Sequence, residues 1–320
     1  MLRTGASNGI VSRGAAFLAF LALGGCSIFA PQIEPVTEPE IMPAKVEPRP
    51  IKPPEPPLLP PVAIVLTSSQ PAYLDVANAL AHHLDDFNVY DLSDRSRPPV
   101  SVLRAINDSD SRTVVAIGLR AARSSVAMSD TPVIFSQVFN HQDYNLLTAN
   151  SRGVAPLAPL DAQLAAWTAI DPAISRIGII IGEGHDALIA EAQLAAQKHD
   201  VELLIRVAHS DQETIYFFRR MVHNIDGFWL FPDNRILSTR SLQAILESAR
   251  RGQVAVAVPN ESMLAMGATI SIATQAEDIA ATIASIIRKI HVEGLQNVPA
   301  ISPLSAIRVV TRDSLKVVRR

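Results

Sequence analysis

Val62-Ala63-Ile64-Val65-Leu66 is a continuous apolar run, and the polar turn Thr67-Ser68-Ser69-Gln70-Pro71 follows it directly. Five apolar residues without a polar interruption are typical of a strand that is buried on both faces of a sheet. Residues 72–84, after the turn, carry apolar side chains at helical spacing. A buried strand followed by a helix is the unit from which parallel α/β sheets are built, and the rest of the sequence repeats this unit.

The alternation of strands and helices continues in two sets. In the first set we expect strands at 88–91, 113–118 and 132–137 and helices at 100–106 and 121–127. The pattern restarts after residue 155, with strands at 176–182, 201–207, 227–231, 254–258 and 307–310, a candidate edge strand at 268–272, and helices at 160–170, 186–198, 212–221, 239–250 and 276–291. The predicted fold class is α/β with two lobes, each a parallel sheet flanked by helices.

Composition limits the classes of protein. The chain has 320 residues, of which 48% are hydrophobic and 18% charged, too apolar for a disordered protein and long enough for two lobes. Lys+Arg 28 against Asp+Glu 31 gives a net charge of −3, so we expect no nucleic-acid partner. A single Cys excludes an intrachain disulfide and a Cys-rich metal site.

The N-terminal residues are typical of an export signal. Arg3 and Arg13 precede an apolar run at 15–23, which is too short to span a membrane. The string Leu23-Gly24-Gly25-Cys26 resembles the bacterial lipobox, which implies removal of residues 1–25 and attachment of diacylglycerol and an acyl chain such as palmitate to Cys26. An ordinary signal peptide with an incidental Cys26 is the alternative. By analogy with lipoprotein sorting, Ser27 favours the outer membrane, with the body facing the periplasm.

A proline-rich segment separates this anchor from the body. Residues 31–61 hold 12 of the 23 prolines, which excludes regular helix and sheet. We assign residues 26–61 to a tether, either a semi-stiff polyproline spacer at about 3.1 Å per residue or a linker of no fixed length.

Catalytic motifs are not found in the sequence. It contains no Gly-x-Ser-x-Gly, His-Glu-x-x-His, P-loop or Gly-x-Gly-x-x-Gly string, so we expect no enzyme, no catalytic residue and no cofactor. His82 and Asp86 share a helical face and could hold a metal ion, but a solvated helix end is the simpler interpretation, and we expect no metal site.

Polar residues gather where the predicted strands end. In open α/β sheets, ligands bind beyond the carboxyl ends of the parallel strands, so these loops are candidates for holding a small polar solute. The same Ser, Asp and Asn side chains could instead cap the helices that follow them, and for each position this alternative stays open.

Several strings, in order, resemble ABC-transporter substrate-binding proteins of the TrpX-like type. They are Val115-Ala116-Ile117-Gly118-Leu119-Arg120, Thr131-Pro132-Val133-Ile134-Phe135, Arg176-Ile177-Gly178-Ile179, Phe231-Pro232-Asp233-Asn234-Arg235 and Val258-Pro259-Asn260-Glu261. The resemblance implies a type I periplasmic-binding fold, with three crossovers between the lobes and a small solute bound in the cleft. It places residues 62–154 plus about 275–298 in the N-lobe, and 155–274 plus about 299–320 in the C-lobe.

The resemblance also implies which side chains face the solute. From the N-lobe these are Ser68, Ser69, Gly118, Leu119, Gln137 and Asn140, and from the C-lobe Glu183, Asp233, Asn234 and Glu261. The family's acidic-Pro step after the fourth strand is replaced here by Val138-Phe139-Asn140-His141-Gln142-Asp143. Aromatic residues make up only 5% of the chain, so a stacking site for an aromatic ligand has no support beyond Tyr73 or Phe139.

Two functions from different classes fit these features. The first, favoured by the order of the loops, is a lipid-anchored protein that binds a small polar solute as the capture component of an ABC-type uptake system and delivers it to a permease. The second is a non-transport outer-membrane lipoprotein that uses the same fold to bind or regulate a cell-envelope protein. Ser27, the proline-rich spacer and the altered loop favour the second.

Overall fold

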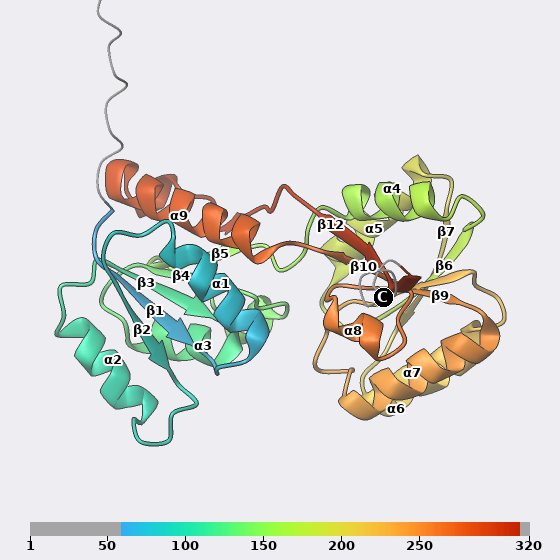
Figure 1. Cartoon of the computed structure of the whole chain (residues 1–320), viewed down its shortest axis with the longest axis horizontal. Helices are drawn as coiled ribbons and strands as arrows, with labels where there is room; N and C mark the ends of the chain where they lie inside the picture. Colours follow the sequence, from blue (N-terminus) through green and yellow to red (C-terminus); the bar gives the residue numbers. More distant parts are fainter. Residues whose placement is uncertain (1–58, 314–320) are drawn as a thin grey trace, which may run out of the picture. The chain divides into compact units, whose positions relative to one another are not determined.

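The computed structural model describes residues 59–313, which form two six-stranded sheets flanked by helices (Figure 1). The chain passes between the two sheets three times, after β5, after β10 and after β11. None of the helices in residues 59–313 combines the length and the apolar character that a membrane crossing requires. The predicted signal peptide, Cys26 and most of the predicted tether lie outside the described residues.

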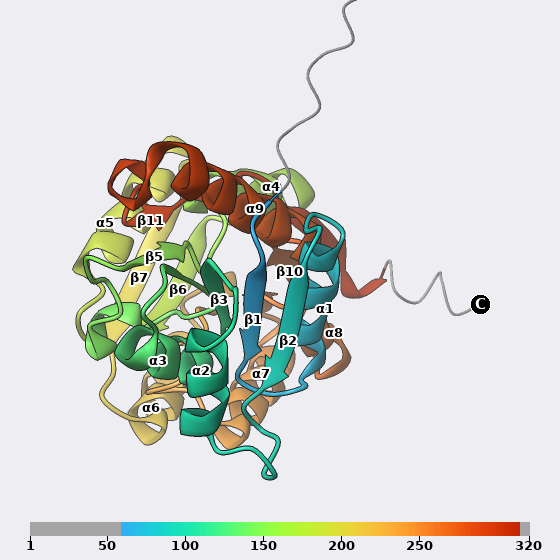
Figure 2. The same ribbon diagram turned by 90° about the vertical axis from the view of Figure 1, so that its left-hand side faces the viewer.

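The first sheet has the strand order β11-β5-β4-β3-β1-β2, and all of its strands run parallel. Its strands are β1 (Val62–Leu66), β2 (Phe87–Asp91), β3 (Thr113–Ile117), β4 (Val133–Ser136), β5 (Ser151–Val154) and β11 (Ile301–Ser302). Figure 2 faces this sheet, with β1 and β2 side by side. Every residue of β1 and β3 is buried, as their uninterrupted apolar sequences predict.

Two pairs of helices cover this sheet. They are α1 (Pro71–Ala81) with α9 (Ala276–Glu293), and α2 (Pro99–Asn107) with α3 (Leu119–Met128). Two short 3₁₀ helices, η1 (His141–Tyr144) and η2 (Leu295–Asn297), follow β4 and α9. Leu59 already packs in the core with α1 and α9, and its amide donates to Asp85 Oδ2 at 3.0 Å, so ordered structure begins before the predicted end of the tether at 61.

The second sheet has the order β12-β10-β9-β8-β6-β7. Its strands are β6 (Arg176–Ile181), β7 (Glu202–Val207), β8 (Gly227–Trp229), β9 (Ala255–Val258), β10 (Ile270–Ala273) and β12 (Arg308–Thr311). Core clusters on its two faces are covered by α4 (Leu160–Ile170) with α5 (Asp186–Lys198), and by α6 (Asp211–Met221) with α7 (Thr239–Gly252) and the short α8 (Ser262–Ala265).

The predicted fold class is confirmed, and three details differ from it. The strand expected at the sheet edge, β10, is covered by β12, which pairs with it antiparallel. Strand β5 was not predicted. Strand β11 pairs in parallel with β5, so residues 301–302 belong to the first sheet and the chain leaves it later than the expected boundary at 299.

Candidate functional site

A cavity of about 1080 Å³ lies where the carboxyl ends of strands from both sheets meet the starts of α1 and α9. The loops after β4, β8 and β9 contribute Gln137, Asn234 and Asn260 to its wall, and the starts of α1 and α9 contribute Tyr73 and Gln275. This is the place where open parallel sheets bind ligands.

The cavity wall is rich in side chains that hydrogen-bond without charge. Amide groups come from Gln70, Gln137, Asn234, Asn260 and Gln275. The Tyr73 hydroxyl is protonated at neutral pH and can both donate and accept, and burial raises its pKa further above the ordinary tyrosine value. Leu119, Phe139 and Met263 add apolar surface beside these groups. Such a wall suits a polar, uncharged or weakly charged solute.

Charges on the cavity wall are partly paired. Arg308 Nε lies 3.0 Å from Glu261 Oε1. Glu277 Oε1 lies 2.9 Å from His83 Nε2, while Asp75 adds a further carboxylate. Glu261, a predicted ligand residue, therefore reaches the cavity with its charge balanced.

Gly118 has a backbone conformation that favours glycine, and the Tyr73 ring packs closely against it. The φ of Gly118 is +85°, in the region that favours glycine. A Cβ at this position would lie 2.7 Å from Thr67 Oγ1 and 2.8 Å from the Tyr73 ring. Thr67 Oγ1 in turn accepts a hydrogen bond from the Ala121 amide at 3.1 Å, near the start of α3. The glycine thus supports the cavity wall through Tyr73, whereas its neighbour Leu119 lines the cavity directly.

Of the remaining predicted ligand residues in the loops after β1, β4 and β6, some line the cavity and others lie outside it. Gln137 lines the cavity, and its Nε2 donates to the Ala72 carbonyl at 3.1 Å. Ser69 is exposed and its hydroxyl donates to Asp91, and neither it nor Ser68 is part of the cavity wall. Glu183 also lies outside the wall, with its carboxylate 3.4 Å from His209 Nδ1.

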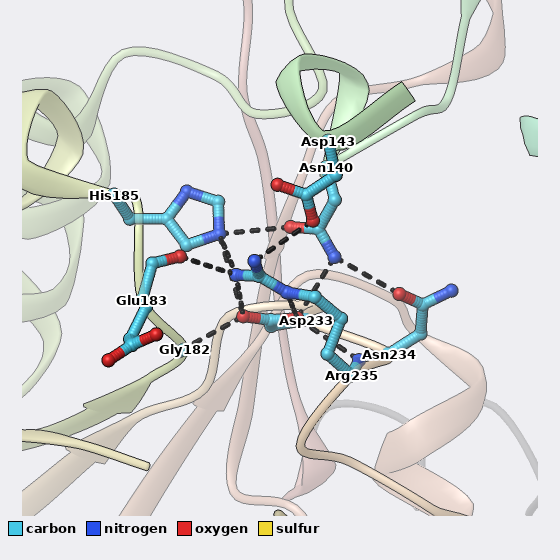
Figure 3. Close-up of polar contacts among 8 residues, drawn as sticks. All are labelled: Asn140, Asp143, Gly182, Glu183, His185, Asp233, Asn234 and Arg235. Carbon is cyan, nitrogen blue, oxygen red and sulfur yellow. Dashed lines mark hydrogen bonds and ion pairs between the residues drawn. The ribbon is translucent and has the colours of Figure 1, made fainter. Parts of the chain in front are cut away.

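Asp233 is the centre of a polar cluster beside the cavity (Figure 3). Its side chain is 0% exposed. Oδ2 accepts from the Gly182 amide at 3.0 Å and from Arg235 Nη2 at 2.8 Å, and Oδ1 accepts from Asn140 Nδ2 at 2.9 Å. Burial alone would raise the pKa of Asp233, but hydrogen bonds from His185, Arg235 and Asn140 outweigh it and hold the pKa far below its ordinary value.

Asn140 connects this cluster to the cavity. It is 3% exposed, its Nδ2 also donates to Asn234 Oδ1 at 3.1 Å, and its Oδ1 lies 2.9 Å from His185 Nε2. Asn140 follows a strand of the first sheet, whereas His185, Asp233 and Asn234 follow strands of the second. The two predicted ligand residues Asn140 and Asp233 therefore bind each other and join the lobes, while Asn234 extends from the pair into the cavity.

Arg235 closes the cluster on its outer side. Its Nη1 donates to Asp143 Oδ2 at 2.9 Å, and its Nη2 donates to the Glu183 carbonyl at 2.9 Å. The hydrogen bond to Asp233 is the main cause that raises the pKa of Arg235. Arg235, His185 and Asp143 were not among the side chains predicted to face the solute. The position of Arg235 directly after the candidates Asp233 and Asn234 is the signal that could have found it.

The loop that departs from the family pattern docks onto the second lobe. Phe139 packs against the core cluster of the second sheet, with its ring centroid 4.8 Å from that of His185 and 6.4 Å from that of Phe231. Together with the Asp143–Arg235 ion pair, this contact gives the altered sequence a clear role, because it ties the loop after β4 to the opposite lobe.

Acid is expected to weaken this region through His141, which is buried in η1. Burial is the largest of the effects that lower the pKa of His141, with His185 adding to it and Asp143 and a backbone hydrogen bond with Phe139 opposing it. Below about pH 6.5 the unfolded chain binds a proton at this histidine before the folded chain does, so stability falls with pH by at most about 1.4 kcal/mol per unit.

Urea unfolding at pH 7.5, 6.5 and 5.5 checks this expectation. His141→Gln should flatten the slope, whereas His223→Gln, at an exposed histidine, should leave it as it is. An unchanged slope in His141→Gln would contradict the assignment.

Comparison with known proteins gives the family. A family model described as ABC transporter substrate binding protein matches residues 89–303. The chain belongs to this family. The resemblance seen in the sequence of this substrate-binding protein is thereby confirmed, and its family is one of binding proteins. A comparison with curated proteins finds no match.

Solved structures share the fold of this substrate-binding protein. A conserved domain protein from Vibrio cholerae has a TM-score of 0.56 at 17% identity, covering 79% of this chain and 92% of its own. An ABC domain from Streptococcus pneumoniae in complex with L-Trp has a TM-score of 0.55 at 17% identity, and the match covers 81% of this chain and 94% of that domain. A third structure is the ligand-free, open form of a substrate binding protein with adhesive properties from Clostridium difficile. Its TM-score is 0.61 at 14% identity, and the match covers 82% of this chain and 95% of that protein. At these identities the likeness shows the type I periplasmic-binding fold.

Proposed function

We propose that this protein captures a small polar solute in the cavity of about 1080 Å³ and delivers it to the permease of an ABC-type uptake system. The observation that carries the proposal is this cavity, which lies at the strand ends of both sheets and is lined by amide side chains from both lobes. Membership of a family of substrate-binding proteins supports the same role.

The solute binds through neutral hydrogen bonds from the amides and Tyr73, while Leu119 and Phe139 contact its apolar surface. Asn234 is the best placed of these groups. Its Oδ1 accepts from Asn140 at 3.1 Å, and its side chain is exposed to the cavity. The amide nitrogen of Asn234 then donates to the solute. Because Asn140 also binds Asp233 and His185, a solute on Asn234 contacts the groups that join the lobes.

The anchor and the location belong to the same proposal. Cys26 carries the lipid, residues 27–58 hold the body away from the membrane, and the anchor lies in the outer membrane facing the periplasm. The support is the lipobox-like Leu23-Gly24-Gly25-Cys26, Ser27 after it, and the prolines that follow. Mass spectrometry of the mature protein tests this, since an unmodified Cys26 or an N-terminus other than Cys26 would contradict it.

A thermal-shift screen of the full chain with amino acids, sugars and polyols tests solute binding. Binding to the folded state raises the unfolding temperature by mass action, with about 2.7 kcal/mol of stabilisation at a hundredfold excess over Kd. Asn234→Ala should reduce or abolish the shift for the solute found, because it removes a donor to the ligand. Ser69→Ala, at a candidate residue outside the cavity, is the matched control and should keep the full shift. A shift that survives Asn234→Ala together with Gln137→Ala would place the solute elsewhere.

One observation favours the second function, in which the protein binds or regulates a cell-envelope partner. The altered loop after β4 ties the lobes through Phe139, Asn140 and Asp143. Such bonds favour a fixed arrangement of the lobes, which suits a docking surface more than repeated opening. If the screen finds no solute and cross-linking in intact cells captures an envelope protein, this second function replaces the first.

A further inference from the structure

A second cavity, of about 520 Å³, lies beside the edge strand β7, between one face of the second sheet and helix α6. It shares no residue with the cavity at the strand ends. Leu204, Phe217 and Met221 give it apolar surface, and they pack in or against the core cluster under α6. Its volume falls in the range of small-molecule sites, about 300–1,000 Å³.

Three arginines surround this apolar surface. Arg176 begins β6, Arg206 lies on β7, and Arg220 lies in the last turn of α6. Only Glu202 adds a carboxylate to the wall, and its Oε2 lies 3.0 Å from Arg176 Nε. The cavity therefore has a local excess of positive charge in a chain whose net charge is −3.

Two of the guanidinium groups are bound to neutral groups. Arg206 Nη1 donates to the Ile205 carbonyl at 2.8 Å. Arg220 Nη1 donates to the Tyr216 hydroxyl at 2.7 Å, and its guanidinium carbon lies 5.6 Å from the centre of the Tyr216 ring, a side chain that is 53% exposed. Each keeps further N–H donors in a planar fork that matches a carboxylate or a phosphate.

Protection of the sheet edge explains only part of this arrangement. A charged side chain on an edge strand prevents pairing with another chain, and Arg206 over the Ile205 carbonyl fits that role. Arg176 is on the inner neighbour of the edge strand, and Arg220 is on a helix. Protection of the sheet edge therefore does not explain why Arg176 and Arg220 line the same apolar surface as Arg206.

We propose that this cavity is a second binding site, which takes a small organic anion made of a carboxylate or phosphate on an aromatic or aliphatic group. The anionic group binds Arg206 and Arg220, and the apolar group covers Leu204 and Phe217. Arg176 joins when the anion displaces Glu202. The site is separate from the solute cavity, because the two share no lining residue.

Isothermal titration of the full chain with 1-naphthyl phosphate tests the proposal. We expect measurable binding at low salt that weakens as the salt concentration rises. Arg206→Ala and Arg220→Ala should each weaken binding by about tenfold or more, because each removes a charge-assisted hydrogen bond. Arg288→Ala, at an exposed arginine of α9, is the control and should bind as the wild type does.

A variant that is expected to tighten binding gives a second test. Glu202→Gln removes the carboxylate that competes for Arg176, so it should tighten binding of 1-naphthyl phosphate several-fold. The neutral analogue 1-naphthol and inorganic phosphate alone should each bind more weakly, because each lacks one half of the recognised chemistry. Asn234→Ala should have no effect.

Two results would overturn the proposal. One is that 1-naphthyl phosphate does not bind at millimolar concentration to a wild-type protein whose thermal unfolding shows it to be folded. The other is that the double variant Arg206→Ala/Arg220→Ala, equally folded, binds as tightly as the wild type.

Discussion

Asp233→Ala is expected to lower the free energy of unfolding by about 3–5 kcal/mol, the usual result of removing one partner from a buried ion pair. The carboxylate is 0% exposed and accepts hydrogen bonds from the Gly182 amide, from Asn140 and from Arg235. Without it, the Gly182 amide and the Asn140 amide nitrogen each lose an acceptor in a buried region, and Arg235 keeps only Asp143, the Glu183 carbonyl and His185 Nε2 as partners. Urea unfolding at pH 7 measures the loss.

Two neighbouring variants serve as controls for Asp233→Ala. Asp233→Asn keeps the shape but places an NH₂ group against N–H donors, so it should also be clearly destabilised. Asn234→Ala, at the adjacent exposed residue, should change stability by no more than about 1 kcal/mol. A loss in Asp233→Ala no larger than in Asn234→Ala would show that the cluster does not hold the lobes.

The stabilisation that Asp233 gives to the folded state depends on pH, because the pKa of its carboxyl is lowered in that state. The group is ionised in both the folded and the unfolded chain at neutral pH, so its stabilising effect is fully present there and does not change down to about pH 5. As the pH falls through about 4, the unfolded chain takes up the proton first and the stabilisation is lost. This window lies well below that of His141, so the two effects can be separated in one pH series.

Gly118→Ala is the second substitution with a large expected effect. Placing a side chain at φ +85° costs about 1–3 kcal/mol, and the crowding against Thr67 and Tyr73 adds about 1–3 kcal/mol more. Because Tyr73 lines the solute cavity, the variant should also weaken solute binding. Thermal unfolding and the ligand-induced shift, measured on the same samples, report the two consequences.

Gly184 offers a matched control for Gly118. Its φ of +81° is nearly the same, but a Cβ there would meet no atom within 4 Å. Gly184→Ala should therefore show the backbone cost alone. A loss in Gly118→Ala no larger than in Gly184→Ala would contradict a cost from crowding against Thr67 and Tyr73.

The alternation of elements could be predicted because the buried parallel strands are uninterrupted apolar runs. β1, β3 and most of β6 are fully buried, and each was located from such a run. β5 reads Ser151-Arg152-Gly153-Val154 and has no such signal, and its glycine is required because a Cβ there would lie 2.5 Å from Phe135 and Ile301. β11 has two residues, too few for any pattern.

The site was predictable where it depends on topology alone. Strand ends converge in parallel sheets, which places Leu119, Gln137, Asn234 and Glu261 on the wall of one cavity. Their contact with a solute stays a prediction. The partners of these side chains depend on contacts across the lobes. Asn140 and Asp233 are 93 residues apart in the chain, and a single sequence contains no sign that they bind each other.

The order in which the sheets take up their strands limits when each lobe can fold. β11 completes the outer edge of the first sheet and β12 the outer edge of the second, and both come from residues 301–311, after every other strand of the two sheets. A ribosome must therefore synthesise the chain through residue 302 before the first sheet is complete, and through residue 311 before the second is. Until then β5 and β10 have exposed edges, so nascent chains that stall before residue 301 are the ones at risk of pairing with one another.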